Sequence, residues 1–139
     1  MAKMAYKYIK NFNSKKNSKA YKKLMQQRVR RWRKEPAIVK IETPTKIARA
    51  RSLGWKRKKG FIVVRARLRK GGMRKQRPRQ GRKTKGLAVR DITPNVSMQK
   101  IAEQRVKRKY QNCEIINSYE VADGGSHKWF EVLLKCQDS

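Results

Sequence analysis

The sequence has few acidic residues and a single histidine. It holds 9 Asp and Glu against 40 Lys and Arg among 139 residues, which gives a formal net charge of +31. His127 flanks a Gly-rich turn without an obvious acid–base partner, so we expect an exposed turn residue, and the carboxylates fall into no motif. Two cysteines beside this lone histidine are too few for a zinc site. These absences argue against an enzyme, a resident metal ion and a cofactor.

Long apolar runs are also missing. No stretch approaches the roughly 20 residues that span a bilayer. The start, MAKMAYKYIKNF, lacks the apolar core and cleavage site of a signal peptide. The pairs Gly71-Gly72 and Gly124-Gly125 are not followed by the Lys and Ser or Thr of a phosphate-binding loop. We therefore expect a cytoplasmic protein with no membrane partner and no small-molecule substrate, in which Cys113 and Cys136 are free thiols.

The cations are unevenly distributed along the chain. Residues 1–110 hold 38 of the 40 bases, whereas residues 111–139 hold 5 of the 9 acids. A free globular protein with such self-repulsion would be poorly stable, so a permanent polyanionic partner is the default inference. We expect the C-terminal part to face away from that polyanion and the rest of the chain to face it.

The central stretch Gly60–Lys85 begins as a strand and ends as a basic segment. Its apolar and cationic residues alternate with a strand period, which predicts one apolar face and one exposed face of arginines: Ile62, Val64, Ala66 and Leu68 against Val63, Arg65, Arg67 and Arg69. From Arg74 to Lys85 there are seven Lys or Arg and no aliphatic side chain. Such a segment cannot offset its own ordering entropy, so we expect it to be ordered only on a polyanion rather than to be a merely solvated charge run.

The N-terminal part is expected to be helical. Apolar spacing predicts a short helix over residues 3–12, and a second helix is capped by Ser18 and ends before Pro36. This second helix carries one apolar stripe: Tyr21, Leu24, Met25, Val29 and Trp32. We interpret the stripe as core packing, although Trp32 lies among arginines and could instead stack on a base.

In the rest of the chain, the residue pattern predicts a strand at 37–42, a helix at 45–53 that ends near Gly54, and a helix from Ser97 to about Lys109. A hairpin follows, because residues 113–122 and 127–136 flank the turn sequence Asp-Gly-Gly-Ser. If Ala122 pairs with His127, the following residues lie opposite one another across the hairpin: Tyr119 and Phe130, Asn117 and Val132, Ile115 and Leu134, Glu114 and Lys135, Cys113 and Cys136. The apolar face so formed, with Tyr119 and Phe130 on it, should pack on the helix at 98–106.

Six segments resemble one known family, the large-subunit ribosomal proteins called L-fifteen-e of archaea and eukaryotes: Ala5–Ile9, Pro44–Lys56, Lys59–Gly71, Ile101–Arg105, Ile116–Tyr119 and Lys128–Leu134. They lie in order over nearly the whole chain, and the basic loop is most similar to archaeal members. The resemblance implies an α+β fold: a small antiparallel sheet with helices, in the order β-α-β-α-β-β, and basic extensions buried in ribosomal RNA. Our own interpretation of the residues gives the same order. Family members usually continue past the final strand with a Gly- and Lys-rich tail, whose contacts are not carried over.

We predict a single domain over 1–139, with a basic helical extension at 1–36, a basic loop at 71–92, and a helix plus hairpin at 97–139. The leading hypothesis is a structural protein of the large ribosomal subunit that binds 23S-type ribosomal RNA beside neighbouring ribosomal proteins, by counterion release and shape recognition. A DNA-compacting nucleoid protein is the alternative, but there is no helix-turn-helix, dimerisation stripe or repeated basic module. A nucleic-acid-processing enzyme lacks candidate catalytic residues.

The predicted RNA-binding residues are the cations and two tryptophans of the basic parts of the chain: Arg28, Arg30, Arg31, Trp32 and Arg33; Arg49, Arg51, Trp55, Lys56, Arg57, Lys58 and Lys59; Arg65, Arg67, Arg69 and Lys70; Arg74, Lys75, Arg77, Arg79, Arg82, Lys83 and Lys85. Arginine outnumbers lysine in the basic segment, which suits bidentate contact with phosphate.

Overall fold

A computed structural model describes residue 8 and residues 18–72, 77–87 and 95–136. Its elements in chain order are α2 (Lys19–Lys34), β1 (Ile38–Ile41), α3 (Ile47–Ser52), β2 (Phe61–Arg69), a 3-10 turn (Thr84–Gly86), α4 (Met98–Lys109), β3 (Cys113–Asp123) and β4 (His127–Cys136). The strands form one antiparallel sheet in the order β1-β2-β4-β3. The expected α+β fold and its order of strands and helices are confirmed.

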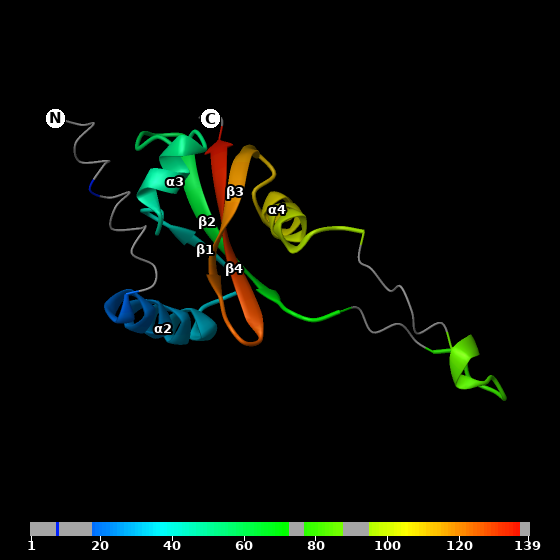
Figure 1. Cartoon of the computed structure of the whole chain (residues 1–139). Coiled ribbons are helices and arrows are strands. Elements are labelled where there is room, and N and C mark those ends of the chain that lie inside the picture. Colours follow the sequence, from blue (N-terminus) through cyan, green and yellow to red (C-terminus); the bar gives the residue numbers. More distant parts are fainter. Residues whose placement is uncertain (1–7, 9–17, 73–76, 88–94, 137–139) are drawn as a thin grey trace.

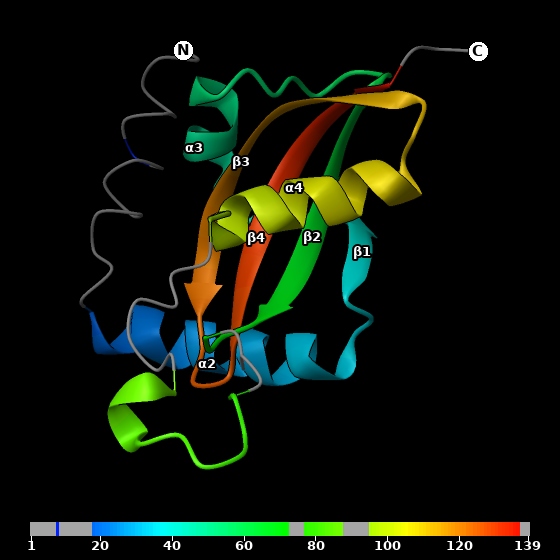
Figure 2. The same ribbon diagram turned by 90° about the vertical axis from the view of Figure 1, so that its right-hand side faces the viewer.

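The sheet lies between two helical layers. Helix α4 packs on one face, while α2 and α3 lie on the other (Figures 1 and 2). The alternation of β2 places Val63 in the core with α2 and α3, and Val64, Ala66 and Leu68 in the core with α4. Because both faces are covered, apolar residues of β2 and β4 pack on both sides of the sheet.

The predicted helix starts are confirmed at α2 and α4. The Ser18 hydroxyl accepts a hydrogen bond from the Tyr21 backbone N–H at 3.2 Å, and the Ser97 hydroxyl accepts one from Lys100 N–H at 3.2 Å. Each hydroxyl therefore satisfies one of the backbone donors left unpaired in a first helical turn. Helix α3 ends just before Gly54, whose φ of 100° is the left-handed conformation typical of a residue after a helix.

The hairpin register is as predicted in its first half and wrong in its second half. Cys113 pairs with Cys136, Glu114 with Lys135 and Ile115 with Leu134. Beyond them, irregularities between residues 115 and 117 and between 120 and 122 shift the pairing, so that Glu120 faces Phe130 and Ala122 faces Trp129. Each β-bulge inserts a residue that opposes none on the partner strand, and no alternation pattern of a single strand reveals it.

The expectation of free thiols is also wrong, because Cys113 and Cys136 form a disulfide. The Cys136 N–H donates outward to the Gly60 carbonyl at 2.7 Å and not to β3. The two cysteines are therefore a non-hydrogen-bonded pair of the hairpin, the kind in which side chains lie closest. Their Cα atoms are 4.0 Å apart, which brings the sulfur atoms into bonding reach.

Two of the sequence predictions fall on residues outside the described part of the chain. These are the helix at 3–12, of which only Tyr8 is described, and the RNA-binding residues Arg74 and Lys75. The boundaries proposed for the extension, the basic loop and the helix plus hairpin stay predictions.

Candidate nucleic-acid interface

Helix α2 carries the densest row of cations on a regular element. Its 16 residues extend for about 24 Å. Met25, Val29 and Trp32 pack on the sheet, so the core interpretation of the stripe is confirmed for these three, whereas Leu24 is 36% exposed and outside the core. The cations of the remaining surface are exposed apart from the half-buried Arg28: Lys19, Lys22, Lys23, Arg30, Arg31, Arg33 and Lys34.

The expected exposed arginine face of β2 does not exist, because α2 lies over it. The Arg65 guanidinium stacks on the Trp32 ring at 4.3 Å from its centroid and forms an ion pair with Glu35. The Arg67 guanidinium donates to the carbonyl oxygen of Arg33. Of the three arginines only Arg69, at the end of the strand, is exposed. Arg65 and Arg67 therefore hold α2 on the sheet.

The two tryptophans predicted to contact RNA lie in the core. Trp32 and Trp55 are each 5% exposed. The Trp32 ring packs on Trp129 with centroids 6.2 Å apart, and the Arg65 guanidinium lies over the Trp32 ring. Neither indole presents a ring face to a base in this conformation.

The predicted cations around α3 and the following loop are at the surface. Arg49 and Arg51 of α3 and all four cations of residues 56–59 are exposed. Lys58 lies with its ammonium 5.9 Å from the centre of the Phe61 ring, at the start of β2. This group lies at the opposite end of β2 from Arg69, so cations mark both ends of the central strand.

The described part of the basic segment, residues 77–87, projects away from the sheet (Figure 1). Its predicted RNA-binding residues are all exposed: Arg77, Arg79, Arg82, Lys83 and Lys85. The chain turns at Gln80 and Gly81, which have φ values of 75° and 64°. No salt bridge joins these cations to the acids of the described residues.

The acids near the hairpin tip are paired with lysines. Lys70 Nζ lies 2.6 Å from Asp123 Oδ1, and Lys128 Nζ lies 3.2 Å from Glu120 Oε2 and 3.3 Å from Asp123 Oδ2. The hydrogen bond from Lys70 lowers the pKa of Asp123, and the one to Glu120 raises the pKa of Lys128. Lys70, which was predicted to bind RNA, therefore pairs with Asp123 of the hairpin in this structure.

A buried carboxylate, Glu131, is a feature that the sequence analysis did not single out. It is fully buried in β4 and accepts hydrogen bonds from the Thr45 backbone N–H at 3.1 Å, the Thr45 hydroxyl and the Tyr119 hydroxyl. Burial raises the pKa of Glu131, against the opposing effect of these hydrogen bonds, and burial beside this carboxylate raises the pKa of Tyr119. The signal in the sequence is a lone Glu inside the apolar run Trp129–Leu134.

Helix α4 adds cations that the predicted set omitted. Arg105, Lys107, Arg108 and Lys109 are exposed in its last turns, and Lys107 Nζ donates to the carbonyl oxygens of Gln111 and Cys113 at 3.1 and 2.9 Å. The basic run Arg105–Lys109 was the signal that could have placed them in the candidate interface.

Two absences among the described residues bear on other functions. No group of three or more His, Cys, Asp or Glu within them could hold a metal ion. None of the described helices is both long enough and apolar enough to cross a membrane.

Comparison with known proteins gives concordant results. A family model described as Ribosomal L15 (L15e) matches residues 4–137. The large ribosomal subunit protein eL15 of Methanocella arvoryzae is 48% identical over 135 residues, which cover 96% of this chain and 68% of that protein. The protein of the same name from Methanocorpusculum labreanum is 43% identical over 139 residues, which cover 100% of this chain and 72% of that protein.

Proposed function

The chain belongs to the ribosomal L15e family, and from this membership we infer that it is a structural constituent of the large ribosomal subunit. The observation that carries the inference is the match of residues 4–137, which includes the sheet, both helical layers and the basic segment. A ribosomal constituent associates with ribosomal RNA and ribosomal proteins, and it acts in the cytoplasm where translation takes place. The family assignment gives no support to the alternative of a DNA-compacting protein.

We further propose that the RNA is of the 23S type and that three cationic surfaces bind it. These surfaces are the exposed side of α2, the loop at residues 56–59 with α3, and the basic segment at 77–87. Each presents Lys and Arg side chains to solvent, whereas Glu120 and Asp123 at the hairpin tip are neutralised by lysines. Neutralising phosphates releases condensed counterions, which supplies affinity without a base code.

We also propose that the role is architectural rather than catalytic. The buried carboxylate Glu131 is saturated by Thr45 and Tyr119 and is closed off from solvent. His127 was expected to be an exposed turn residue, but it is half-buried at the start of β4. Its imidazole Nδ1 lies beside the Ser126 hydroxyl, and desolvation followed by the charge of Arg67 lowers its pKa. A general acid or base must come within hydrogen-bond reach of the proton that it transfers, and Glu131 and its partner Tyr119 are both buried away from such a contact.

Co-sedimentation tests the proposed function. A tagged copy of the chain, expressed in an archaeal cell, should migrate with large subunits in a sucrose gradient and stay with them at moderate salt. Binding of the purified chain to large-subunit ribosomal RNA should also exceed its binding to duplex DNA at equal salt. A chain that stays at the top of the gradient, or that prefers the duplex, would overturn the proposal.

A further inference from the structure

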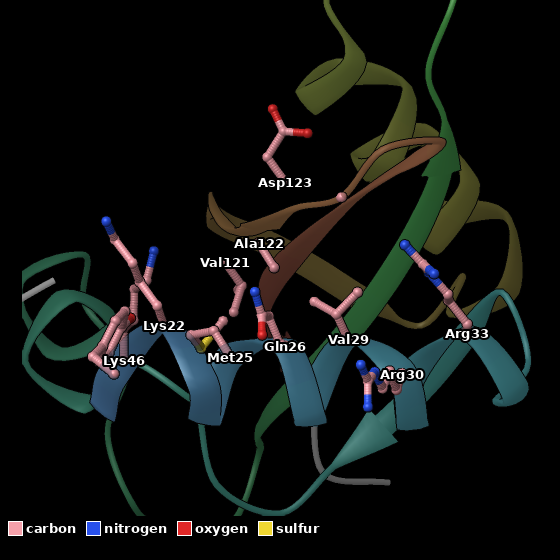
Figure 3. A pocket seen from close by; sticks show the side chains of 12 residues that line it. Lys22, Met25, Gln26, Val29, Arg30, Arg33, Lys46, Val121, Ala122 and Asp123 are labelled. Atoms are coloured by element: carbon pink, nitrogen blue, oxygen red, sulfur yellow. The ribbon is translucent and has the colours of Figure 1, made fainter. Parts of the chain in front are cut away.

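A groove of about 540 Å³ separates α2 from the tip of the β3–β4 hairpin (Figure 3). Its floor is apolar and comes from both elements: Met25 and Val29 of α2, and Val121 and Ala122 of β3. Val121 and Ala122 are anchored in the core with Trp32 and Trp129, so this floor is part of the folded body. The half-exposed Tyr21 also lines the groove.

Cations stand at both ends of this floor. Lys22 and Lys46 lie at one end, and Arg30 and Arg33 lie at the other (Figure 3). Lys22 and Arg33 are eleven residues apart on α2, which corresponds to about 16 Å along the helix. Lys46 donates from Nζ to the Glu120 carbonyl at 2.8 Å, and this contact holds its ammonium beside the groove.

The one acid of the lining does not oppose this charge. Asp123 directs its carboxylate away from the floor (Figure 3), where Lys70 and Lys128 neutralise it. The groove therefore combines an apolar floor with a rim that is positive at both ends. Gln26 lines the groove from α2 and offers an amide donor and acceptor between its two cationic ends.

Only some ligands match both the apolar floor of the groove and its two positive ends. A double helix presents phosphates but keeps its bases stacked, so it leaves the apolar floor uncovered. An apolar side chain of a neighbouring protein covers the floor but brings no anion to the cationic ends of the groove. An unpaired nucleotide has a flat ring for the floor and for Tyr21, and flanking phosphates for the two ends.

We propose that this groove binds an unpaired nucleotide of ribosomal RNA, with its base on the floor and its flanking phosphates on the two pairs of cations. The inference rests on the proposed function and adds a defined subsite to it. A base held in this way fixes the position of α2 on the RNA through shape, with little dependence on base identity. It gives this fold a contact besides charge, one that salt screens much less.

Two neighbouring glutamines provide a matched test. Gln26 and Gln27 are both exposed on α2, but only Gln26 lines the groove. Gln26→Glu and Gln27→Glu change the net charge equally, so a general loss of electrostatic attraction affects both alike. The experiment purifies large subunits that carry tagged wild-type or variant chain and probes the reactivity of every ribosomal RNA base. Ultraviolet crosslinking of the wild-type subunits then identifies what contacts Tyr21 and Met25.

The expected result is a nucleotide adduct on Tyr21 or Met25, and one unpaired nucleotide that is protected in wild-type and Gln27→Glu subunits but reactive in Gln26→Glu subunits. Tyr21→Ala should weaken binding of the chain to its RNA about fivefold or more, because base–aromatic stacking is lost. A crosslinked peptide of another protein, or identical reactivity in the two glutamate variants, would overturn the inference while co-sedimentation still upheld the proposed function. A chain absent from the subunits would overturn both.

Discussion

At the residue scale, Arg65 and Arg69 show how two cations of one strand come to have different roles. Arg65 is 10% exposed as a side chain and lies between the Trp32 ring and Glu35, whereas Arg69 is exposed at the strand end. A cation on an aromatic face that also has a charge-assisted hydrogen bond contributes to stability when little water reaches it. Arg65 therefore belongs to the fold and Arg69 to the candidate interface.

Arg65→Gln should lower the free energy of unfolding by about 2–3 kcal/mol, because it removes the stacking and leaves Glu35 short of a partner. Arg69→Gln should change it by less than about 0.5 kcal/mol, as surface substitutions usually do, and should weaken RNA binding instead. Denaturant unfolding and RNA titration of both variants separate these effects. Equal stability of the two variants would show that Arg65 has no structural role.

Glu131 predicts a pH dependence at the same scale. Burial raises the pKa of Glu131 in the folded chain above the ordinary value of 4.5, which applies to the unfolded chain. At a pH between the ordinary pKa and the raised pKa, the folded chain therefore binds more protons than the unfolded chain. Stability must then fall as pH rises through this range, by about 1.36 kcal/mol for each unit by which the pKa is raised.

Glu131→Gln should remove this contribution while its amide oxygen still accepts from Thr45. The difference in unfolding free energy, wild type minus variant, should therefore decrease as pH is raised from the ordinary carboxyl range towards neutrality. The measurement is a series of urea unfolding curves at matched ionic strength. A difference that is constant or that increases with pH would contradict the burial argument.

At the element scale, the hairpin contributes to both layers of the molecule. Phe130, Leu134 and Ile115 pack on α4, as expected. Tyr119 was expected beside them but lies on the opposite face, where it contacts the core of α2 and α3 and donates to Glu131. The β-bulge between Ile115 and Asn117 accounts for the change, because it moves the residues that follow it to the other face of the sheet.

Phe130→Ala should therefore cost roughly 3–5 kcal/mol, because Phe130 is 3% exposed and its loss leaves a cavity between β4 and α4. Leu24→Ala is the control, since Leu24 is a large apolar residue that is exposed on α2. Thermal unfolding of the chain without RNA measures both. If the two variants melted together, α4 would not be held by this core.

The basic segment is the element whose order we expect to depend on RNA. Residues 77–87 expose five cations, and their side chains form no ion pair with the other described residues. Trypsin should cut the RNA-free chain first in this segment, whereas sites at the half-buried Arg65 and Arg67 should resist. In assembled subunits the segment should be protected. Early protection without RNA would contradict this expectation.

At the scale of the whole molecule, charge should dominate affinity. If about eight phosphates are neutralised, the slope of log affinity against log salt should be around −6 to −7. Replacing Arg82 and Lys83 together by Gln should reduce the slope by about 2, and Lys135→Gln on the hairpin should leave it unchanged. Filter binding over a range of salt concentrations provides the slopes. A wild-type slope shallower than about −2 would show that charge is not the main contribution.

Properties that depend on neighbours along the chain were determined by the sequence alone. The caps at Ser18 and Ser97, the order of strands and helices, and the first hairpin pairs follow from spacing and turn chemistry. The excess of cations likewise required a polyanionic partner whatever the fold. The resemblance of six ordered segments indicated the family.

Tertiary structure alone decided which cations meet solvent. The alternation in β2 shows that Arg65 and Arg67 share a face, but not that α2 crosses that face and covers them. The same holds for the burial of Trp32 and Trp55, the acceptance of two hydrogen bonds by Glu131 from Thr45, and the groove beside α2. These features depend on contacts between residues far apart in the chain, which local periodicity does not encode. A cation on an amphipathic strand therefore becomes part of the core or of the interface according to the element that packs above it.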